Sequence, residues 1–194
     1  VLYDRQGGVA SAIPCAPTTQ QSITVNPSSA TTVSAVFECE GGNFDVTWSG
    51  IVSVQESIVI GNGTTVSIAG NHVSDLTVGD SSDSTGTSSD ESSAILTTDN
   101  IGPVFLVRGG TLNIEGVAIR GGNSMNATET AGLSVINGGG ISAEDANVTV
   151  TGCTFENNFA DWVGGGLFAN RSRVEVRDSA FRECKAGDTP VAGE

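Results

Sequence analysis

Residues 138–160 read GGGISAEDANVTVTGCTFENNFA, and residues 164–186 read GGGLFANRSRVEVRDSAFRECKA, so the second segment repeats the first 26 residues later. Most apolar residues fall on apolar residues along the match, for example Phe155 on Phe181. Self-similarity at a fixed period of this length is the signature of a solenoid, in which each repeat is one supersecondary unit. We therefore interpret the two segments as two stacked coils.

The same pattern extends toward the N-terminus. Phe105–Ile119 aligns with Ile141–Phe155 at an offset of 36 residues, and Ile58–Ile68 matches Phe105–Ile114 after one residue is added. Each coil has three short segments of alternating apolar residues, separated by turns rich in Gly, Asn or Asp. This predicts an all-β fold, a right-handed parallel β-helix with three short strands per coil and like side chains stacked inside. A β-sandwich with accidental repetition is the alternative.

Some segments lack the pattern. Residues 1–38 show no clear periodicity and are expected to form an irregular N-terminal arm and cap, before a β-helix over residues 39–194. Within the cap, residues 28–39 fit either a short helix or the first strand. Residues 80–93, which are acidic, rich in serine and free of apolar side chains, are expected to form a solvated loop, and residues 123–137 a second insertion.

The composition excludes several classes of partner. Eight Lys and Arg against 22 Asp and Glu give a net charge of −14, which disfavours nucleic acid and anionic membrane surfaces. Hydrophobic residues make up 38% of the 194 residues, enough for one domain with a closed core. No apolar run reaches the roughly 18 residues of a membrane span, and the start at Val1 without a leader suggests a mature or excised segment.

The glycosylation signals favour a secreted glycoprotein, located outside the cell at its surface or in a matrix. N-x-S/T sequons are acceptors for N-linked glycans in secreted proteins, and most of those in this chain fall in expected turns or loops. The four sequons begin at Asn62, Asn126, Asn147 and Asn170.

The four cysteines fit the same oxidising compartment. A disulfide between Cys15 and Cys39 would tie the irregular N-terminus to the first coil, and loop-closure entropy gives it a contribution of roughly 3 kcal/mol. Cys153 and Cys184 align to different corners of their coils, so their bridge is the weaker candidate, and a partner outside this chain is the alternative.

Two motifs carry a resemblance to known proteins. Residues 39–50, CEGGNFDVTWSG, resemble the opening of a family of secreted β-helix proteins of microbial eukaryotes. Residues 153–160, CTFENNFA, followed by three glycines, are similar to the coil shared by the pectate-lyase-like superfamily and polymorphic outer-membrane-protein repeats. The resemblance implies a right-handed parallel β-helix over about residues 38–186, in a group with adhesins, surface proteins and enzymes alike. It also implies an interior asparagine ladder at Asn158, which Cys184 would interrupt one coil later.

Enzymatic chemistry is not indicated. Uronate-cleaving β-helix enzymes need several carboxylates that hold calcium and an Arg or Lys base on one sheet face. Arg108 and Arg120 have only Glu144 and Glu156 in the next coil, which surface salt bridges explain equally well. The single histidine, His72, is expected in a turn. We therefore expect no catalytic residue, no cofactor and no resident metal.

A weak Ca²⁺ candidate lies in the acidic loop, whose carboxylates are hard ligands but lack the fixed spacing of a calcium-binding loop. Its residues are Asp80, Asp83, Asp90 and Glu91. Trp48 and Trp162 are aromatic candidates for stacking on sugar rings, and packing at corners of the coil is the preferred interpretation for both.

The functional expectation is a non-enzymatic extracellular structural or adhesive module. An uncapped coil exposes unpaired backbone groups and a slice of core, so we expect self-association end to end into a filament or matrix. Further coils of a longer chain are an alternative partner. The alternative function is a lyase-like or carbohydrate-binding β-helix that acts on acidic polysaccharide.

Overall fold

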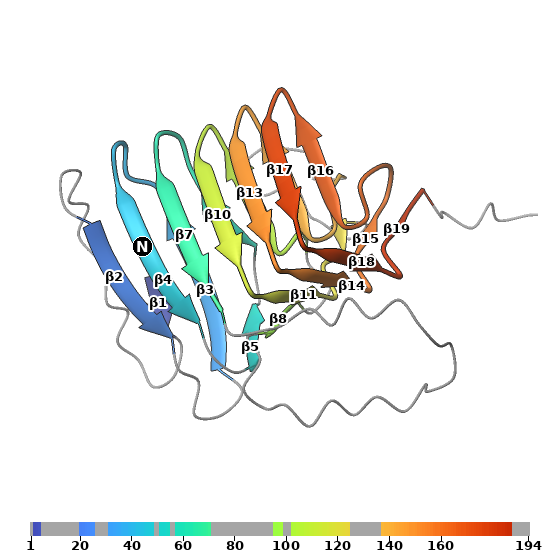
Figure 1. The fold of residues 1–194 in the computed structure, drawn as a ribbon, viewed down its shortest axis with the longest axis horizontal. Helices are drawn as coiled ribbons and strands as arrows, with labels where there is room; N and C mark the ends of the chain where they lie inside the picture. Colours follow the sequence, from blue (N-terminus) through green and yellow to red (C-terminus); the bar gives the residue numbers. More distant parts are fainter. Residues whose placement is uncertain are drawn as a thin grey trace, which may run out of the picture.

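The computed structural model describes most of the coiled region of the chain. The described residues are 2–4, 20–25, 31–48, 51–54, 57–70, 95–98, 102–124 and 137–187. Within these ranges the elements are β-strands, and no α-helix occurs among them (Figure 1).

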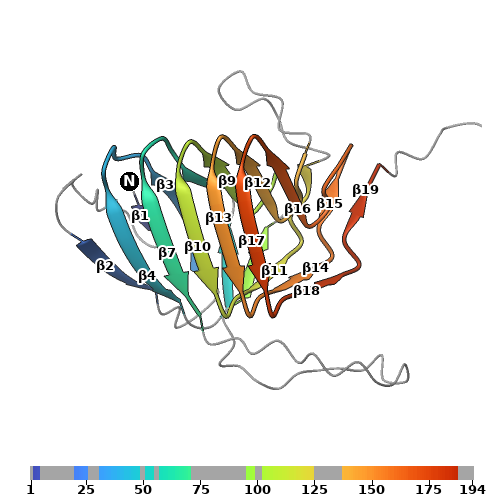
Figure 2. The ribbon, with the colours of Figure 1, turned by 45° about the horizontal axis from the view of Figure 1, so that its top comes forward.

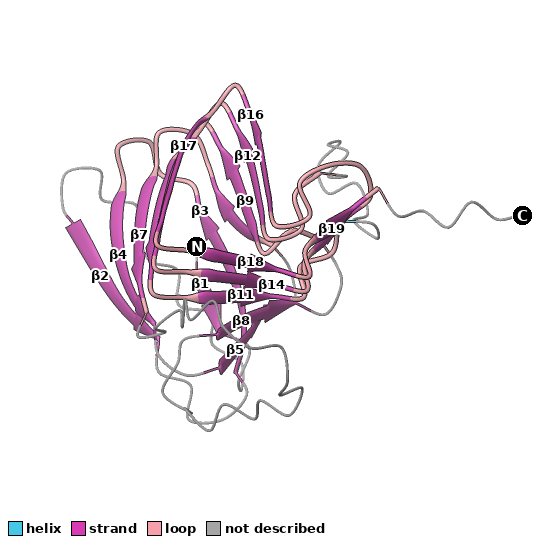
Figure 3. Ribbon diagram, turned by 45° about the vertical axis from the view of Figure 1, so that its right-hand side comes forward, coloured by secondary structure: helices cyan, strands magenta, loops and turns pink. Residues whose placement is uncertain are grey.

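The strands form three faces around a common interior, and the coil has a triangular outline (Figure 3). The chain visits faces I, II and III in turn before the next coil begins. Face I contains β2 (Gln20–Val25), β4 (Asn43–Trp48), β7 (Thr65–Ala69), β10 (Thr111–Glu115), β13 (Asn147–Thr151) and β17 (Arg173–Arg177). Face II contains β5 (Ile51–Val54), β8 (Ile95–Thr98), β11 (Ala118–Arg120), β14 (Thr154–Glu156) and β18 (Ala180–Arg182). Face III contains β6 (Ile58–Ile60), β9 (Phe105–Arg108), β12 (Ile141–Glu144) and β16 (Leu167–Asn170).

Neighbouring strands within each face are parallel, and they lie side by side along the long axis of the molecule (Figures 1 and 2). The register confirms the predicted alignments. Phe155 pairs with Phe181 at the offset of 26, and Ile141 pairs with Phe105 at the offset of 36. Ile58 pairs with Phe105 in the earliest predicted coil, so the parallel β-helix is the fold of this chain.

Side-chain columns fill the interior because alternate residues of a strand point to opposite faces. On face I the inward column of Val66, Leu112 and Val148 is buried, whereas Asn113 and Thr149 of the outward column are half-buried. The rings of Phe155 and Phe181 stack with centroids 4.5 Å apart and an interplanar angle of 6°. These columns form one continuous hydrophobic core.

The triple glycine that marks each repeat has a steric cause. A Cβ atom on Gly140 would lie 2.4 Å from the carbonyl oxygen of Gly166 and 2.8 Å from the ring of Phe155. Such approaches are shorter than van der Waals contact, so only glycine lets the corner before face III lie against the aromatic column. The next coil repeats this arrangement at Gly166, where a Cβ atom would meet the ring of Phe181.

The N-terminal region differs from the expected irregular cap. The segment for which a helix or a strand was open is a strand, β3 (Thr31–Phe37), which pairs in parallel with both β5 and β6 and so joins faces II and III. β2 pairs in parallel with β4, so the ladders begin at Gln20, within the range assigned to the cap. A short strand, β1 (Leu2–Asp4), pairs antiparallel with β3. The acidic loop at residues 80–93 lies outside the described residues.

Candidate functional site

Among the residues that the structure describes, one amide side chain is fully buried in the interior, that of Asn158. Its Oδ1 atom accepts a hydrogen bond of 3.0 Å from the Gly122 backbone N–H, and its Nδ2 atom donates one of 3.0 Å to the Ile119 carbonyl oxygen. Nδ2 also lies 3.7 Å from the Cys184 sulfur in the next coil. The side chain of Asn158 forms hydrogen bonds with two backbone groups of the preceding coil, and the next residue in its column is Cys184. Its role is therefore structural.

Cys153 and Cys184 are free thiols, and the weaker predicted bridge between them is absent. The Cys153 sulfur lies 3.3 Å from the Thr151 carbonyl oxygen at one corner, whereas the Cys184 sulfur lies 3.5 Å from the Phe155 carbonyl oxygen at another. The two thiols therefore belong to different columns. Burial raises the pKa of the Cys153 thiol, which keeps it protonated and unreactive at neutral pH.

The predicted bridge from Cys15 to Cys39 cannot be followed in full, because Cys15 lies outside the described residues. Cys39 is buried and is not a free thiol. Its backbone N–H donates to the Thr64 hydroxyl at 2.8 Å. No disulfide joins two described residues, and the pairing stays a prediction.

Three of the four charged residues considered for catalysis, Arg120, Glu144 and Glu156, are engaged in ion pairs between coils. The fourth, Arg108, forms no ion pair with a described residue, and its Nε atom is buried without a hydrogen-bond partner. Arg120 Nε lies 2.7 Å from Glu156 Oε2, and the two residues are register partners on face II. Glu144 accepts hydrogen bonds from Asn170 and Arg171 of the following coil. This agrees with the salt-bridge interpretation of these side chains.

No cluster of three His, Cys, Asp or Glu that could hold a metal ion occurs among the described residues. His72 and the Ca²⁺ candidates lie outside the described residues, so they remain untested. The Ca²⁺ candidates are Asp80, Asp83, Asp90 and Glu91.

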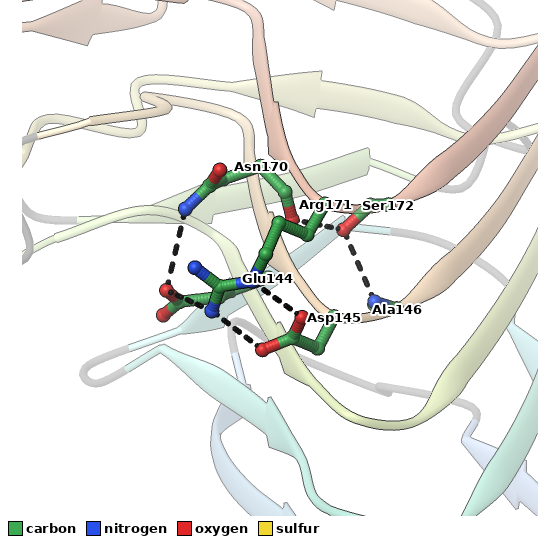
Figure 4. A network of polar contacts seen from close by, with 6 residues as sticks. All are labelled: Glu144, Asp145, Ala146, Asn170, Arg171 and Ser172. Carbon is green, nitrogen blue, oxygen red and sulfur yellow. Dashed lines mark hydrogen bonds and ion pairs between the residues drawn. The ribbon is translucent and has the colours of Figure 1, made fainter.

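A polar network covers the corner between faces III and I (Figure 4). Arg171 donates from Nε and Nη2 to the two carboxylate oxygens of Asp145 at 2.7 and 2.6 Å, and from Nη2 to Glu144 at 3.2 Å. The hydrogen bond from Arg171 holds the pKa of the Asp145 carboxyl below its usual value. Ser172 accepts a hydrogen bond of 3.0 Å from the Ala146 backbone N–H. Opposite charges at equivalent positions of the 26-residue repeat point to this pair, which the apolar pattern alone does not reveal.

The sequons within the described residues lie at this same corner. Asn62 is exposed in the turn between β6 and β7, and Asn147 is exposed at the start of β13. Asn170 is half-buried at the end of β16, where its Nδ2 atom lies 3.4 Å from Glu144 Oε1. Asn126 lies outside the described residues. Glycans on the first two positions would extend from a single edge of the coil.

A shallow groove with a volume of about 370 Å³ crosses the outer side of face I. Its lining mixes apolar residues with polar ones, and the polar ones include Asp45, Ser67, Asn113, Glu115 and Thr149. Asn113 Nδ2 donates to Ser67 Oγ at 3.3 Å, so the amide is partly used within the protein. The groove combines hydroxyl, amide and carboxylate groups and has no aromatic side chain in its lining.

The last described coil, residues 164–187, leaves apolar side chains in contact with solvent, and we call it the tail coil. Phe181 is 46% exposed and Val176 42% exposed, whereas their partners one coil earlier, Phe155 and Val150, are fully buried. The prediction that Trp162 packs at a corner of the coil is wrong, because its side chain is 70% exposed in the turn that enters this coil. Packing is confirmed for Trp48, which is 4% exposed on face I. All large hydrophobic residues that are exposed among the described residues lie in the tail coil or in the turn that enters it, and they are Trp162, Val163, Val176 and Phe181.

Comparison with known proteins adds no family to this picture. No family model, no curated protein and no solved structure matches the chain. Among the described residues, no helix is long and apolar enough to span a membrane.

Proposed function

We propose that this chain is a non-enzymatic structural or adhesive module that joins to another β-helix coil through its tail coil. The observation that carries the proposal is the exposure of Phe181 and Val176, because the residues at the same positions of the two preceding coils are buried. These residues are Phe155, Ile119, Val150 and Ile114. An edge strand also presents backbone N–H and C=O groups that a further strand can pair with. A parallel coil stacked there would continue the strand ladders and cover the exposed side chains of Phe181 and Val176.

End-to-end contacts between copies are heterologous, so they propagate into filaments instead of closing into a ring or dimer. The sequons at one corner support an extracellular place for such a filament, since N-linked glycans keep that edge in water. The resemblance of the CEGGNFDVTWSG segment to secreted β-helix proteins of microbial eukaryotes supports the same assignment. We therefore place the module in an extracellular matrix or at a cell surface.

The test is the oligomeric state of the chain expressed through a secretory route. Light scattering after size exclusion should give a mass that rises with protein concentration, and negative-stain images should show rods. Phe181→Glu should shift the protein to monomers, whereas Thr65→Glu in β7 on face I should leave assembly unchanged. A monodisperse monomer at the highest soluble concentration would overturn the proposal. Intact mass before and after deglycosylation checks the secretory assignment.

The alternative function, binding or cleavage of an acidic polysaccharide, is favoured by the groove on face I. Its hydroxyl and amide groups are of the kind that bind sugar hydroxyls, and Asp45 and Glu115 could approach a polyanion only through a bridging cation. Polygalacturonate with and without calcium is the probe. Formation of unsaturated uronate, followed by ultraviolet absorbance, would favour the alternative over the structural role.

A further inference from the structure

Charge is distributed unevenly along the axis of the coil. The tail coil has five of the chain's eight Lys and Arg residues against three acidic residues, a local net charge of +2. The remaining residues carry three basic against 19 acidic side chains. Residues 6–107 contain ten Asp and Glu and no Lys or Arg. The basic residues of the tail coil are all exposed, and they are Arg171, Arg173, Arg177, Arg182 and Lys185.

Cations in this solenoid already bind carboxylates one coil away. Arg120 pairs with Glu156 of the next coil, and Arg171 pairs with Asp145 of the preceding one. In the face II column Arg120, Glu156 and Arg182 follow one another in register, so the charge alternates from coil to coil. Successive strands are about 4.8 Å apart, which long side chains span easily. A coil that follows the tail coil is therefore expected to offer carboxylates to these cations.

Carboxylates occupy the matching corner at the other end of the molecule. Glu38 and Glu40 are exposed in the turn between β3 and β4, which is the corner between faces III and I. Arg171 and Arg173 lie at the same corner of the tail coil. If β17 of one copy pairs with β2 of the next, β4 is the second strand beyond β17, so the two corners lie two strand spacings, about 10 Å, apart, and opposite charges face each other across that distance. Two tail coils placed together would bring cations against cations.

Resting on the proposed function, we propose that charge selects the partner and direction of stacking: the basic tail coil docks the acidic N-terminal end of a second copy. β17 then pairs with β2 of that copy, and β18 pairs with the face II part of its β3. β1 lies antiparallel along Val33–Ala35 of β3, so docking exchanges this short ladder for a parallel one. Assembly is head to tail and weakens as salt screens the charges.

Charge reversal at each end tests whether charge sets the direction of stacking, as distinct from whether coils stack at all. The tail variant is Arg173→Glu with Lys185→Glu, since neither cation forms an ion pair with a described residue. The head variant is Glu38→Lys with Glu40→Lys. Each variant alone should assemble about tenfold or more weakly than wild type, because like charges then face each other. An equimolar mixture of the two should regain assembly, since each repels itself and attracts the other.

Two control variants change the charge in the same two directions, but on the sides of coils between the two ends. Thr65→Glu and Glu115→Lys on face I should assemble as wild type does, and circular dichroism should show that every variant is folded. Wild-type assembly should fall when NaCl is raised from about 0.05 to 0.5 M, where the Debye length shortens several-fold.

The outcomes distinguish the two proposals. If wild type never assembles, the proposed function fails, and this inference fails with it. If wild type assembles but neither salt nor charge reversal changes the mass, or if a closed dimer forms, stacking survives and the charge inference is overturned. Binding of a polyanion such as polygalacturonate to the tail coil without self-assembly would likewise overturn it.

Discussion

The interior amide of Asn158 should contribute several kcal/mol to the free energy of unfolding, and the Asn158→Ala variant measures this contribution. The substitution leaves the Gly122 N–H and the Ile119 carbonyl, each now bonded at 3.0 Å, without partners in a fully buried site. A buried polar group left unsatisfied costs about 1–3 kcal/mol, and the vacated volume adds roughly 1 kcal/mol. We expect a loss of about 4 kcal/mol in the free energy of unfolding. In a domain of this size that lowers Tm by roughly 10 °C.

Urea unfolding followed by circular dichroism measures the loss, with Asn113→Ala as the matched control. Asn113 makes one hydrogen bond of 3.3 Å to Ser67 on the half-buried outer side of face I, so its removal should cost within about 0.5 kcal/mol. A loss below about 1 kcal/mol for Asn158→Ala, or equal losses for both variants, would refute the assignment of Asn158 as a buried link between coils.

Asn158→Asp adds a test with a definite sign. One carboxylate oxygen keeps the bond from Gly122, while the other would face the Ile119 carbonyl oxygen without a proton to donate. Burial and this repulsion raise the folded-state pKa of the new carboxyl above its unfolded value of about 3.9. The variant should therefore come closest to wild type below about pH 4, and its deficit should grow as pH rises through the folded-state pKa. A deficit independent of pH would contradict this reasoning.

Three further predictions concern the aromatic column, the corner network and the triple glycine. Phe155→Ala should cost about 3–5 kcal/mol because the ring is fully buried, and Phe181→Ala distinctly less because its ring is 46% exposed; urea unfolding compares them. The Asp145 carboxyl should titrate in NMR below its ordinary pKa of 3.8 and return toward that value in Arg171→Gln, and an unchanged titration would show that the hydrogen bond is not formed. Gly140→Ala should destabilise by about 1–3 kcal/mol, since its Cβ atom would overlap the carbonyl oxygen of the next coil, and a neutral effect on Tm would exclude that close approach.

The core could be predicted from sequence because a stacked coil repeats its own environment. Leu112 and Val148 occupy the same position one coil apart, so one alignment predicts both their register and their burial. The prediction was weaker where no repeat informs it. β3 pairs with strands of both face II and face III, and no later described coil has a strand of this kind.

Corners and turns limited the prediction of the candidate site. Trp162 lies in a turn, where exposure depends on the path of the chain and no periodic pattern reports it. The separation of Cys153 and Cys184 follows from their different corners, which the alignment did indicate. The cluster of Lys and Arg in the tail coil is visible in the sequence. Its position at one end of the molecule becomes known only from the fold.

The ladders keep their register when the chain between equivalent strands changes length. Face I pairs β10 with β13 across 36 residues and β13 with β17 across 26, and all five residues of each strand remain matched. The additional residues fall between β11 and β12, and the columns on either side keep their alignment. The length of the segment between β11 and β12 is therefore independent of the strand spacing. A foreign sequence inserted there should project from the surface, while the distance between successive coils along the axis stays constant.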